Sequence, residues 1–294
     1  MGKKGKRGDK PSEKKVILKR IDALAKKLEK ELEGADLFAP LPPTEDCPIC
    51  LVRLPRVKRG NYKGCCGKRM CNGCFKENRR VIEANAKEAG KSFSLTSLAC
   101  PFCRAPEPTR SQYLDQLKLR ASQHDGEACN KLGISYANGK NGSQMDLITS
   151  LHYFIQAIEL GSAEACGNIA ARLEAGKGVP VDKAKAALFY EISALRGSIC
   201  SRLCIAMAEY GLGSHEVGIR HFKIAEEAGM QPALDMLKKI FNSANGKFPG
   251  KEFISKKELE TLDRMCHEAQ EEVKSEEREK HLTKEDKLNT WRKC

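Results

Sequence analysis

The sequence predicts a mainly α-helical protein in which a small cysteine-rich module precedes an α-solenoid of helix pairs. Two observations lead to this prediction. Eight of the 14 cysteines lie within residues 47–103. Past residue 124, short motifs return at intervals of 36 and 37 residues, which is typical of helical units that bury their apolar faces by stacking. A length of 294 residues allows about two domains.

The composition excludes several classes of protein. With 40% hydrophobic and 31% charged residues, the chain is expected to be globular and soluble, neither collagen-like nor fully disordered. No stretch approaches the ~18 consecutive apolar residues that span a bilayer. The opening MGKKGKRG lacks the apolar core of a signal peptide and the Ser or Thr of a myristoylation pattern. We therefore expect an intracellular protein, cytoplasmic or nuclear, without a membrane partner.

Residues 1–40 are expected to form a basic tail followed by an amphipathic helix. The apolar residues of this segment recur at spacings of four, three and four: Ile17, Ile21, Leu24 and Leu28. They share one face of a helix predicted over residues 12–33 and ended by Gly34. Three roles stay open for this face: packing on the cysteine-rich module, self-association, or none, with the helix as a solvated tether. The basic opening fits a nuclear localisation signal or a disordered tail.

The net charge of +13 comes from the first third of the chain. Residues 1–40 carry +5, residues 41–46 carry −2 and residues 47–104 carry +10, whereas the remainder is balanced. This uneven distribution indicates separate modules with separate roles.

The cysteines of residues 45–105 have the spacing of metal ligands. They include three CxxC pairs, CPIC, CNGC and CPFC, and the first histidine of the chain is His124. Two thiolates three positions apart can reach one tetrahedral Zn²⁺, and four thiolates close a structural site. Eight thiolates fill two sites. A chance cluster of buried cysteines is the alternative, and three CxxC pairs argue against it. We therefore predict two zinc ions held by cysteine alone.

The order CPIC, CCGKRMCNGC and CPFCR resembles a RING-type zinc finger, in which the ligand pairs alternate between two ions. The resemblance implies that the first zinc is held by Cys47, Cys50, Cys71 and Cys74. It implies that the second zinc is held by Cys65, Cys66, Cys100 and Cys103. Most RING domains have a histidine where CGKRMC places Lys68, and an ammonium cannot bind zinc. The sequence is thus more similar to the all-cysteine variant, with Cys65 and Cys66 as adjacent, geometrically tight ligands.

The same resemblance implies a ubiquitin ligase. RING ligases have no nucleophile and act by holding a ubiquitin-charged conjugating enzyme in a reactive orientation. Ile49, between the first two cysteines, and Pro101, after the seventh, match the positions that contact the conjugating enzyme. Arg104 follows the last ligand and matches the arginine that bridges conjugating enzyme and ubiquitin. Packing around the zinc loops is the alternative role for Ile49 and Pro101.

The +10 charge of the module also admits nucleic-acid binding. Only a few aromatic residues accompany the basic ones: Tyr62, Phe75, Phe93 and Phe102. A base-stacking platform is therefore poorly supported, and nucleic acid ranks last among the candidate partners.

The repeats are predicted over residues 125–241. Glu127-Ala128-Cys129 returns as Glu164-Ala165-Cys166, and Gly161-Ser162 returns as Gly197-Ser198. Each unit has two helical stretches, and its second helix is expected to end at a glycine: Gly161, Gly197 or Gly229. An aromatic column is expected at Phe154, Tyr190 and Phe222, followed three residues later by Ala157, Ser193 and Ala225.

The consensus of these units resembles Sel1-like repeats, relatives of the tetratricopeptide class, which implies a surface for a protein substrate or adaptor. No catalytic constellation is visible, because His152, His215 and His221 lack patterned companions. The cysteines of the repeats are interpreted as buried small apolar residues: Cys129, Cys166, Cys200 and Cys204.

Further helices are predicted on either side of the repeats. Residues 109–123 are expected to link the zinc finger to the stack and to cap it. A capping-box pattern, Ser255 to Glu258, begins a helix over residues 255–280 that is expected to close the solenoid, followed by a charged tail at 281–294. Its expected apolar stripe is Leu259, Leu262, Met265, Ala269 and Val273.

Taken together, the sequence predicts a RING-type ubiquitin ligase that binds a substrate or adaptor through Sel1-like repeats. The chief alternative is a zinc-containing interaction scaffold that activates no conjugating enzyme. A nucleic-acid-binding zinc protein comes third.

Overall fold

The computed structural model of the chain describes residues 11–57, 60–88, 90, 99–243 and 248–272. Within them, no helix combines the length and the apolar character needed to cross a membrane. The basic opening (residues 1–10), Phe93, Val273 and the predicted charged tail (281–294) lie outside the described residues.

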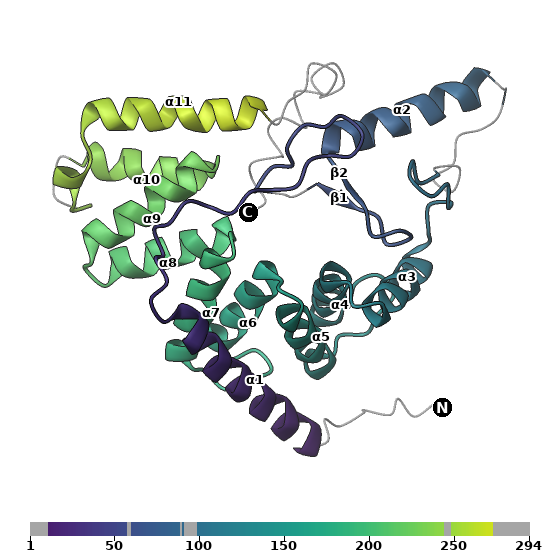
Figure 1. The fold of residues 1–294 in the computed structure, drawn as a ribbon, viewed down its shortest axis with the longest axis horizontal. Helices are drawn as coiled ribbons and strands as arrows, with labels where there is room; N and C mark the ends of the chain where they lie inside the picture. The colour runs from purple at the N-terminus through teal and green to yellow at the C-terminus, as the bar shows by residue number, and fades with distance from the viewer. Residues whose placement is uncertain (1–10, 58–59, 89, 91–98, 244–247, 273–294) are drawn as a thin grey trace, which may run out of the picture. The chain divides into compact units, whose positions relative to one another are not determined.

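Helices dominate the described part of the chain, and two short strands lie in the cysteine-rich module (Figure 1). In chain order the elements are α1 (Pro11–Leu32), β1 (Asn61–Tyr62), β2 (Arg69–Met70), α2 (Asn72–Glu88), α3 (Arg110–Ser122), α4 (Gly126–Asn138), α5 (Leu147–Glu159), α6 (Ala163–Ala175), α7 (Lys183–Leu195), α8 (Ile199–Gly211), α9 (His215–Glu227), α10 (Gln231–Phe241), η2 (Lys251–Phe253) and α11 (Lys256–Glu272). The mainly α-helical fold predicted from the sequence is confirmed.

The chain forms two compact units, and each is built from two stretches of sequence. Unit 1 comprises Met1–Ala35 and Arg110–Ile192, and unit 2 comprises Asp36–Thr109 and Ser193–Cys294. The cysteine-rich module therefore belongs to unit 2, and helix α7 begins in unit 1 and ends in unit 2.

Helix α1 is part of the core of unit 1. Its buried residues are Ile17, Ile21, Leu24, Ala25 and Leu28. They share one apolar cluster with side chains of α5, α6 and α7. At the edge of this contact, Arg20 Nη1 lies 2.9 Å from His152 Nδ1, and Arg20 Nη2 lies 3.3 Å from the Glu159 carboxylate. None of the three roles left open by the sequence is the one observed, because an apolar stripe indicates that a helix is covered but not by what.

The repeat helices have uniform lengths and well-defined starts. Helices α4 to α9 each contain 13 residues and follow one another as three pairs. Five of them begin with a side chain that accepts a backbone N–H, as helix N-caps do: Asp125, Asp146, Ser162, Asp182 and Ser198. The glycines predicted to close the second helices have φ of +87°, +92° and +84°: Gly161, Gly197 and Gly229. Helix α3 packs on α4 through the buried Leu114 and Leu117.

The aromatic column is only partly as predicted. Phe154 and Phe222 are fully buried. Tyr190 is half-buried, and its hydroxyl donates to Glu174 at 3.0 Å, while the neighbouring Phe189 is fully buried. The three small residues that follow the column are all buried. A tyrosine hydroxyl buried in the core would need a hydrogen-bond partner. In the second repeat Phe189 therefore fills the core, and the hydroxyl of Tyr190 bonds to Glu174 at the surface.

Two of the four repeat cysteines contradict the sequence interpretation. Cys129 and Cys166 are buried, whereas Cys200 and Cys204 are exposed. Both exposed cysteines lie on α8, whose residue equivalent to Cys129 and Cys166 is Arg202, the fourth residue of the helix in each case. Cys200 and Cys204 are two positions before and after that buried position, so they lie on other faces of the helix.

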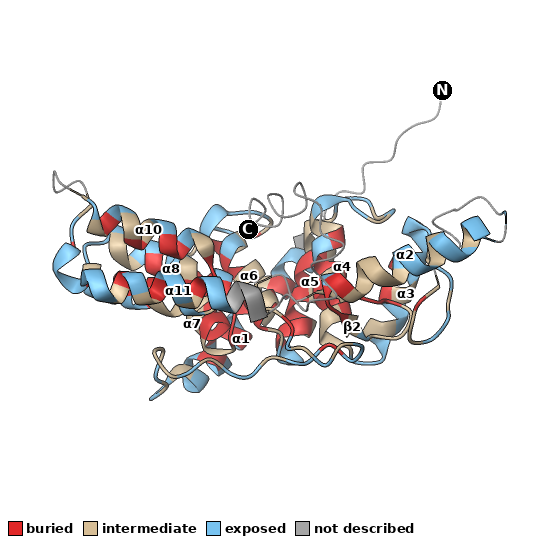
Figure 2. Cartoon of the chain, turned by 90° about the horizontal axis from the view of Figure 1, so that it is seen from above, coloured by how far each residue is buried: buried red, intermediate tan, exposed pale blue. Residues whose placement is uncertain are grey.

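The end of unit 2 is closed by α10 and α11. The predicted capping box is present: the Glu258 N–H donates to Ser255 Oγ at 3.1 Å, and the Ser255 N–H donates to the Glu258 carboxylate at 3.5 Å. Helix α11 packs on α9 and α10 through Leu259, Leu262 and Cys266. Glu226 of α9 is fully buried near this helix. Figure 2 shows how much of the repeat region is buried, in contrast to α2, in which Gly73 is the buried residue.

Candidate functional site

Two loops of the cysteine-rich module share one backbone conformation. In CPICL, the Leu51 N–H donates to the Cys47 carbonyl at 2.8 Å, and the Cys47 N–H donates to Val52 at 2.9 Å. In CPFCR, the Arg104 N–H donates to the Cys100 carbonyl at 2.9 Å, and the Cys100 N–H donates to Ala105 at 2.7 Å. Such tight turns bring both sulfur atoms of a CxxC pair to one point.

Each of these loops ends at a residue in the left-handed region. Leu51 has φ +57° and Arg104 has φ +63°, a conformation that costs a non-glycine residue about 1–2 kcal/mol. This conformation of Leu51 and Arg104 was not predicted from the sequence. The signal that could have found it is the CPxC motif that both loops share. Each loop is flanked by a short antiparallel bridge, Asp46 with Arg53 and Ala99 with Pro106.

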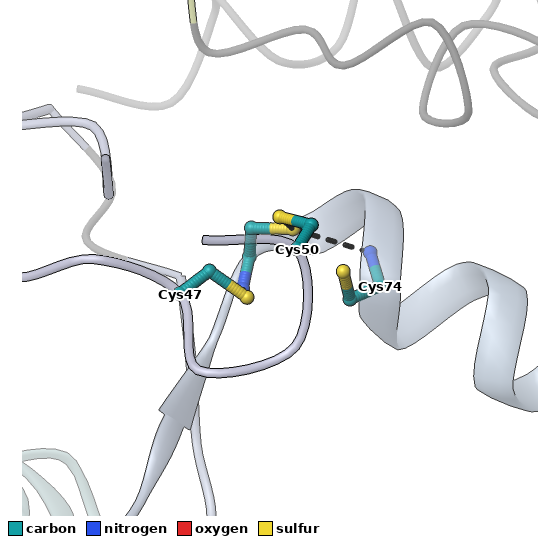
Figure 3. Close-up of side chains that lie close together, drawn as sticks. Cys47, Cys50 and Cys74 are labelled. Carbon is teal, nitrogen blue, oxygen red and sulfur yellow. Dashed lines mark hydrogen bonds between the residues drawn. The ribbon is translucent and has the colours of Figure 1, made fainter. Parts of the chain in front are cut away.

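The first cysteine quartet joins the CPIC loop to the start of α2. It consists of Cys47, Cys50, Cys71 and Cys74, whose sulfur atoms all lie within 4.8 Å of one another. Figure 3 shows Cys47 and Cys50 on their loop and Cys74 on the helix, with their sulfur atoms facing a common space. The Cys50 and Cys71 sulfurs are 3.9 Å apart.

The second quartet consists of Cys65, Cys66, Cys100 and Cys103, again with all sulfur atoms within 4.8 Å. The adjacent cysteines both reach it: Cys66 Sγ lies 3.8 Å from Cys100 Sγ, and Cys65 Sγ lies 3.4 Å from Cys103 Sγ. This is achieved by a tight turn in which the N–H groups of Cys66 and Gly67 both donate to the Lys63 carbonyl. Gly67 has φ +73°, so glycine suits this turn. The quartets coincide with the ligand sets that the RING resemblance implies.

The first cysteine of each CPxC pair is the easier one to ionise. Burial opposes ionisation of Cys47, but the backbone N–H groups of Cys50, Cys71 and Ile49 outweigh it and lower the pKa of the thiol to about 7. Burial likewise opposes ionisation of Cys100, and the N–H groups of Cys103 and Phe102 outweigh it, so its pKa is lowered.

Three other thiols of the quartets show the opposite shift. Burial, followed by hydrogen bonds and repulsion among the clustered sulfurs, raises the pKa of Cys65, Cys66 and Cys74. Four sulfurs this close cannot all ionise unless a cation lies among them. A divalent ion reverses this electrostatic penalty, because a coordinating thiol is deprotonated outright.

The donor set fits structural zinc. For a tetrahedral ion with Zn–S distances of about 2.3 Å, the sulfurs should be about 3.8 Å apart. The three sulfur pairs described above are 3.4–3.9 Å apart, and every pair in each quartet lies within 4.8 Å. Softer thiolate ligands in a closed set of four favour zinc over magnesium or calcium. Lys68, which occupies the position of the usual histidine, is exposed, and its Nζ lies 5.4 Å above the Phe102 ring.

The module has its own small core and a supporting ion pair. Leu54 and Met70 are buried with Cys47 and Cys71, and Phe75 packs partly buried against this cluster. Lys63 Nζ lies 2.9 Å from the Glu107 carboxylate. Helix α2 starts at Asn72 and includes Cys74 in its first turn.

The three residues expected to contact a conjugating enzyme and ubiquitin all reach the surface. Ile49 is 45% exposed on the first loop, Pro101 is half-buried on the second, and Arg104 is exposed directly after the last cysteine. Ile49 is therefore not needed for the core of the module, which argues against simple packing as its role.

Comparison with known proteins identifies the repeats. Residues 126–162 and 163–198 match the Sel1 repeat family, and neither match reaches the cysteine-rich module. No curated protein matches the chain. The match supports Sel1 repeats, as the sequence predicted, and a scaffold of the kind that binds protein partners.

Solved structures with a similar arrangement of helices are remote. A Sel1 repeat protein from Oxalobacter formigenes is 22% identical, with a TM-score of 0.47 over 66% of this chain and 78% of its own. The protective antigen c5321 of uropathogenic Escherichia coli, which has an SLR fold, is 24% identical, with a TM-score of 0.44 over 53% of this chain and 33% of its own.

Proposed function

We propose that this Sel1-repeat protein is a RING-type ubiquitin ligase, whose zinc module docks a ubiquitin-charged conjugating enzyme and whose repeats hold a protein substrate or adaptor. Two zinc ions would be held by the two cysteine quartets. Zinc would supply no reaction step there; it would close the loops that carry the docking residues. Such a site requires reduced thiols, as in the cytoplasm or nucleus.

The observation that carries the proposal is the pair of matching CPxC loops. They anchor Ile49 and Pro101 beside cysteines of different quartets, so both side chains are held on short, hydrogen-bonded turns. A docking surface with fixed geometry is what catalysis by positioning requires. Transfer then needs no nucleophile from this chain, in keeping with the absence of patterned His, Asp or Ser residues in its sequence.

Arg104 would act on ubiquitin itself. Its guanidinium carries up to five donors and stays charged, and the side chain projects from the last turn of the second loop without being buried. It could bridge carbonyl groups of the conjugating enzyme and ubiquitin and so restrict the orientation of the thioester. The expected result of removing it is slow transfer with docking retained.

The test is the discharge of ubiquitin from a panel of charged conjugating enzymes. The wild-type protein should accelerate discharge, and Ile49→Ala should reduce the acceleration about tenfold or more, because truncating an interface anchor costs about 1–2 kcal/mol or more. Val181→Ala is the matched control, since Val181 is 58% exposed and lies on a repeat loop. Arg104→Ala should also slow discharge, and it keeps a non-glycine residue at the same left-handed position.

Zinc content must be two ions per chain in each variant, so that loss of docking is separated from loss of fold. If a zinc-loaded wild-type protein accelerates none of the enzymes in the panel, the ligase proposal is wrong and the interaction scaffold takes its place.

A further inference from the structure

The segment between α1 and the zinc module lies against the third repeat within unit 2. This linker segment comprises residues 36–42, Asp-Leu-Phe-Ala-Pro-Leu-Pro. Its Leu37 carbonyl accepts a hydrogen bond of 2.6 Å from Arg202 Nη1 on α8. The other terminal nitrogen of Arg202 donates to the Ala194 carbonyl at 3.2 Å. One guanidinium thus joins the linker segment to the end of α7.

Arg202 departs from the pattern of the repeats. It is the fourth residue of its helix, the position that holds Cys129 in the first repeat and Cys166 in the second. Those cysteines are buried, so a repeat can fold with a small apolar side chain at the fourth position of this helix. Arg202 is buried to the same degree, at 2% exposure. Burial of an arginine is costly without hydrogen-bond partners, and the linker carbonyl supplies the shortest one.

The aromatic residue of the linker segment contacts two neighbouring residues of α9. The Phe38 ring stacks on His221 of α9, with centroids 4.7 Å apart and planes at 28°. The guanidinium of Arg220 lies 3.8 Å from the Phe38 ring centroid, in cation–π geometry. Burial, then the charges of Arg202 and Arg220, lower the pKa of His221 to about 4. A neutral His221 can accept from Arg202 Nη1, which lies 3.3 Å from its Nδ1.

A missing side chain makes room for the proline end of the segment. A Cβ atom added to Gly197 would lie 2.8 Å from Pro42 Cγ. The equivalent glycine of the first repeat, Gly161, has nothing within 4 Å of such an atom. Leu41 packs against the apolar cluster of α8 to α11. Leu37, Phe38 and Leu41 stay half-buried, so the contact is shallow.

We propose that Arg202, Arg220, His221 and Gly197 form a recognition site for a proline-containing peptide that presents an aromatic residue in a short turn, and that the linker segment occupies this site in cis. The Ala39 N–H donates to the Asp36 carbonyl at 3.1 Å and closes this turn, and the Leu37 carbonyl within it accepts from Arg202. The prolines beyond the turn fix φ and add no N–H donors, so a buried arginine that donates to a turn carbonyl suits such a ligand. The proposal rests on the role of the repeats as a receptor and names the chemistry of the partner. A partner segment of this kind must displace the linker.

Because the linker segment already occupies the site, a partner must bind tightly enough to displace it. A tethered segment competes at an effective concentration in the millimolar range. A free peptide should therefore bind the wild-type protein poorly and bind a variant with a weakened linker well. The test is fluorescence anisotropy of a labelled peptide of residues 35–43, ADLFAPLPP, titrated with the full chain.

Phe38→Ala in the protein should bind the peptide at least tenfold more tightly than the wild type, and Val181→Ala should match the wild type. In the Phe38→Ala background, Arg202→Met should weaken binding at least tenfold. Because Arg202 is buried, its variant could fail to fold. The exposed Arg220→Gln is the second variant and should weaken binding about two- to fivefold, as loss of an exposed cation–π contact predicts. A peptide with alanine in place of its phenylalanine should not bind.

Equal binding to wild type and Phe38→Ala, no binding to Phe38→Ala, or binding unchanged by Arg220→Gln would each overturn the proposal. No ubiquitin transfer enters this measurement. A failed ligase assay therefore leaves the peptide site standing, and a failed peptide assay leaves the ligase proposal standing.

Discussion

Glu226 shows how one buried residue can govern stability. The side chain is 0% exposed on α9. Burial, followed by repulsion from Glu227 and Asp263, raises its pKa to about 8, although Cys266 opposes the shift. The carboxyl group is therefore protonated in the folded protein at neutral pH, whereas in the unfolded chain it ionises near its ordinary value of 4.5.

The sign of the resulting pH dependence follows from proton binding. Between pH 4.5 and 8 the folded state holds a proton that the unfolded state has released. The contribution of Glu226 to the free energy of unfolding is thus fully present below pH 4.5 and is lost as the pH rises toward 8. The free energy of unfolding falls over this range by at most about 1.4 kcal/mol per pH unit. Glu226→Gln should remove this part of the pH dependence. Urea unfolding at pH 5, 6.5 and 8 measures it.

Glu260→Gln, at an exposed position of α11, serves as the control and should leave the pH profile unchanged. Comparing the two variants also cancels the pH dependence of the zinc module. Identical slopes for wild type and Glu226→Gln would show that Glu226 does not titrate with a raised pKa.

Single residues also mark the limit of sequence analysis. The exposure of Cys200 and Cys204 could have been predicted by aligning α8 with α4 and α6, because that alignment puts Arg202 at the buried position. The environment of Arg202 could not, since the carbonyl that it binds is 165 residues away in the sequence. Short-range patterns carry no information about such a pair.

At the scale of single helices, the repeats provide a matched test of capping. Ser162 accepts the Ala165 N–H at the start of α6. Ser214 occupies the same place before α9 but makes no side-chain cap hydrogen bond. The serines are alike in sequence and differ in geometry: ψ is 115° at Ser162 and 60° at Ser214.

Ser162→Ala should lower the free energy of unfolding by about 0.5–2 kcal/mol, because an orphan N–H of the helix loses its acceptor. Ser214→Ala should change it by much less. Chemical unfolding followed by circular dichroism at 222 nm compares the two. A larger loss in Ser214→Ala would contradict the assignment of the caps.

Helices differ in how far the sequence predicts them. The 36- and 37-residue spacings, the closing glycines and the capping box at Ser255 are local signals, and the structure has the corresponding elements. The helices that α1 packs against could not be predicted, because its apolar stripe fits any apolar surface. This stripe consists of Ile17, Ile21, Leu24 and Leu28. Tyr190 was misplaced because an aromatic column says nothing about which of two adjacent rings points inward.

For the whole molecule, the metal content is the most direct test of the two quartets. The chain should bind two zinc ions, and Cys66→Ser should reduce the number to one, because three thiolates and a hydroxyl no longer form a closed site. Cys200→Ser, at an exposed cysteine outside the quartets, should keep both ions. Zinc released on thiol oxidation and measured with a colorimetric chelator gives the count. Two ions in Cys66→Ser would exclude it as a ligand.

The grouping of the eight cysteines was predictable because CxxC spacing constrains each pair locally and the RING resemblance supplies the order of the pairs. What could not be predicted is the division of the molecule. The cysteine-rich module shares a unit with the last repeat helices, while α1 shares one with the first repeats. Composition and charge change at residue 40 and at residue 104, but they do not reveal which distant stretches fold together.

The place of α1 has a consequence during protein synthesis. Arg20 of α1 meets His152 of α5 across a sequence separation of 132 residues. At a translation rate of ~5–20 residues per second, the ribosome needs roughly 7–26 s to make that stretch. For this time the apolar face of α1 has emerged, but the helices that cover it do not yet exist. The nascent chain therefore presents an amphipathic helix that chaperones can bind while the cysteine-rich module downstream is being made.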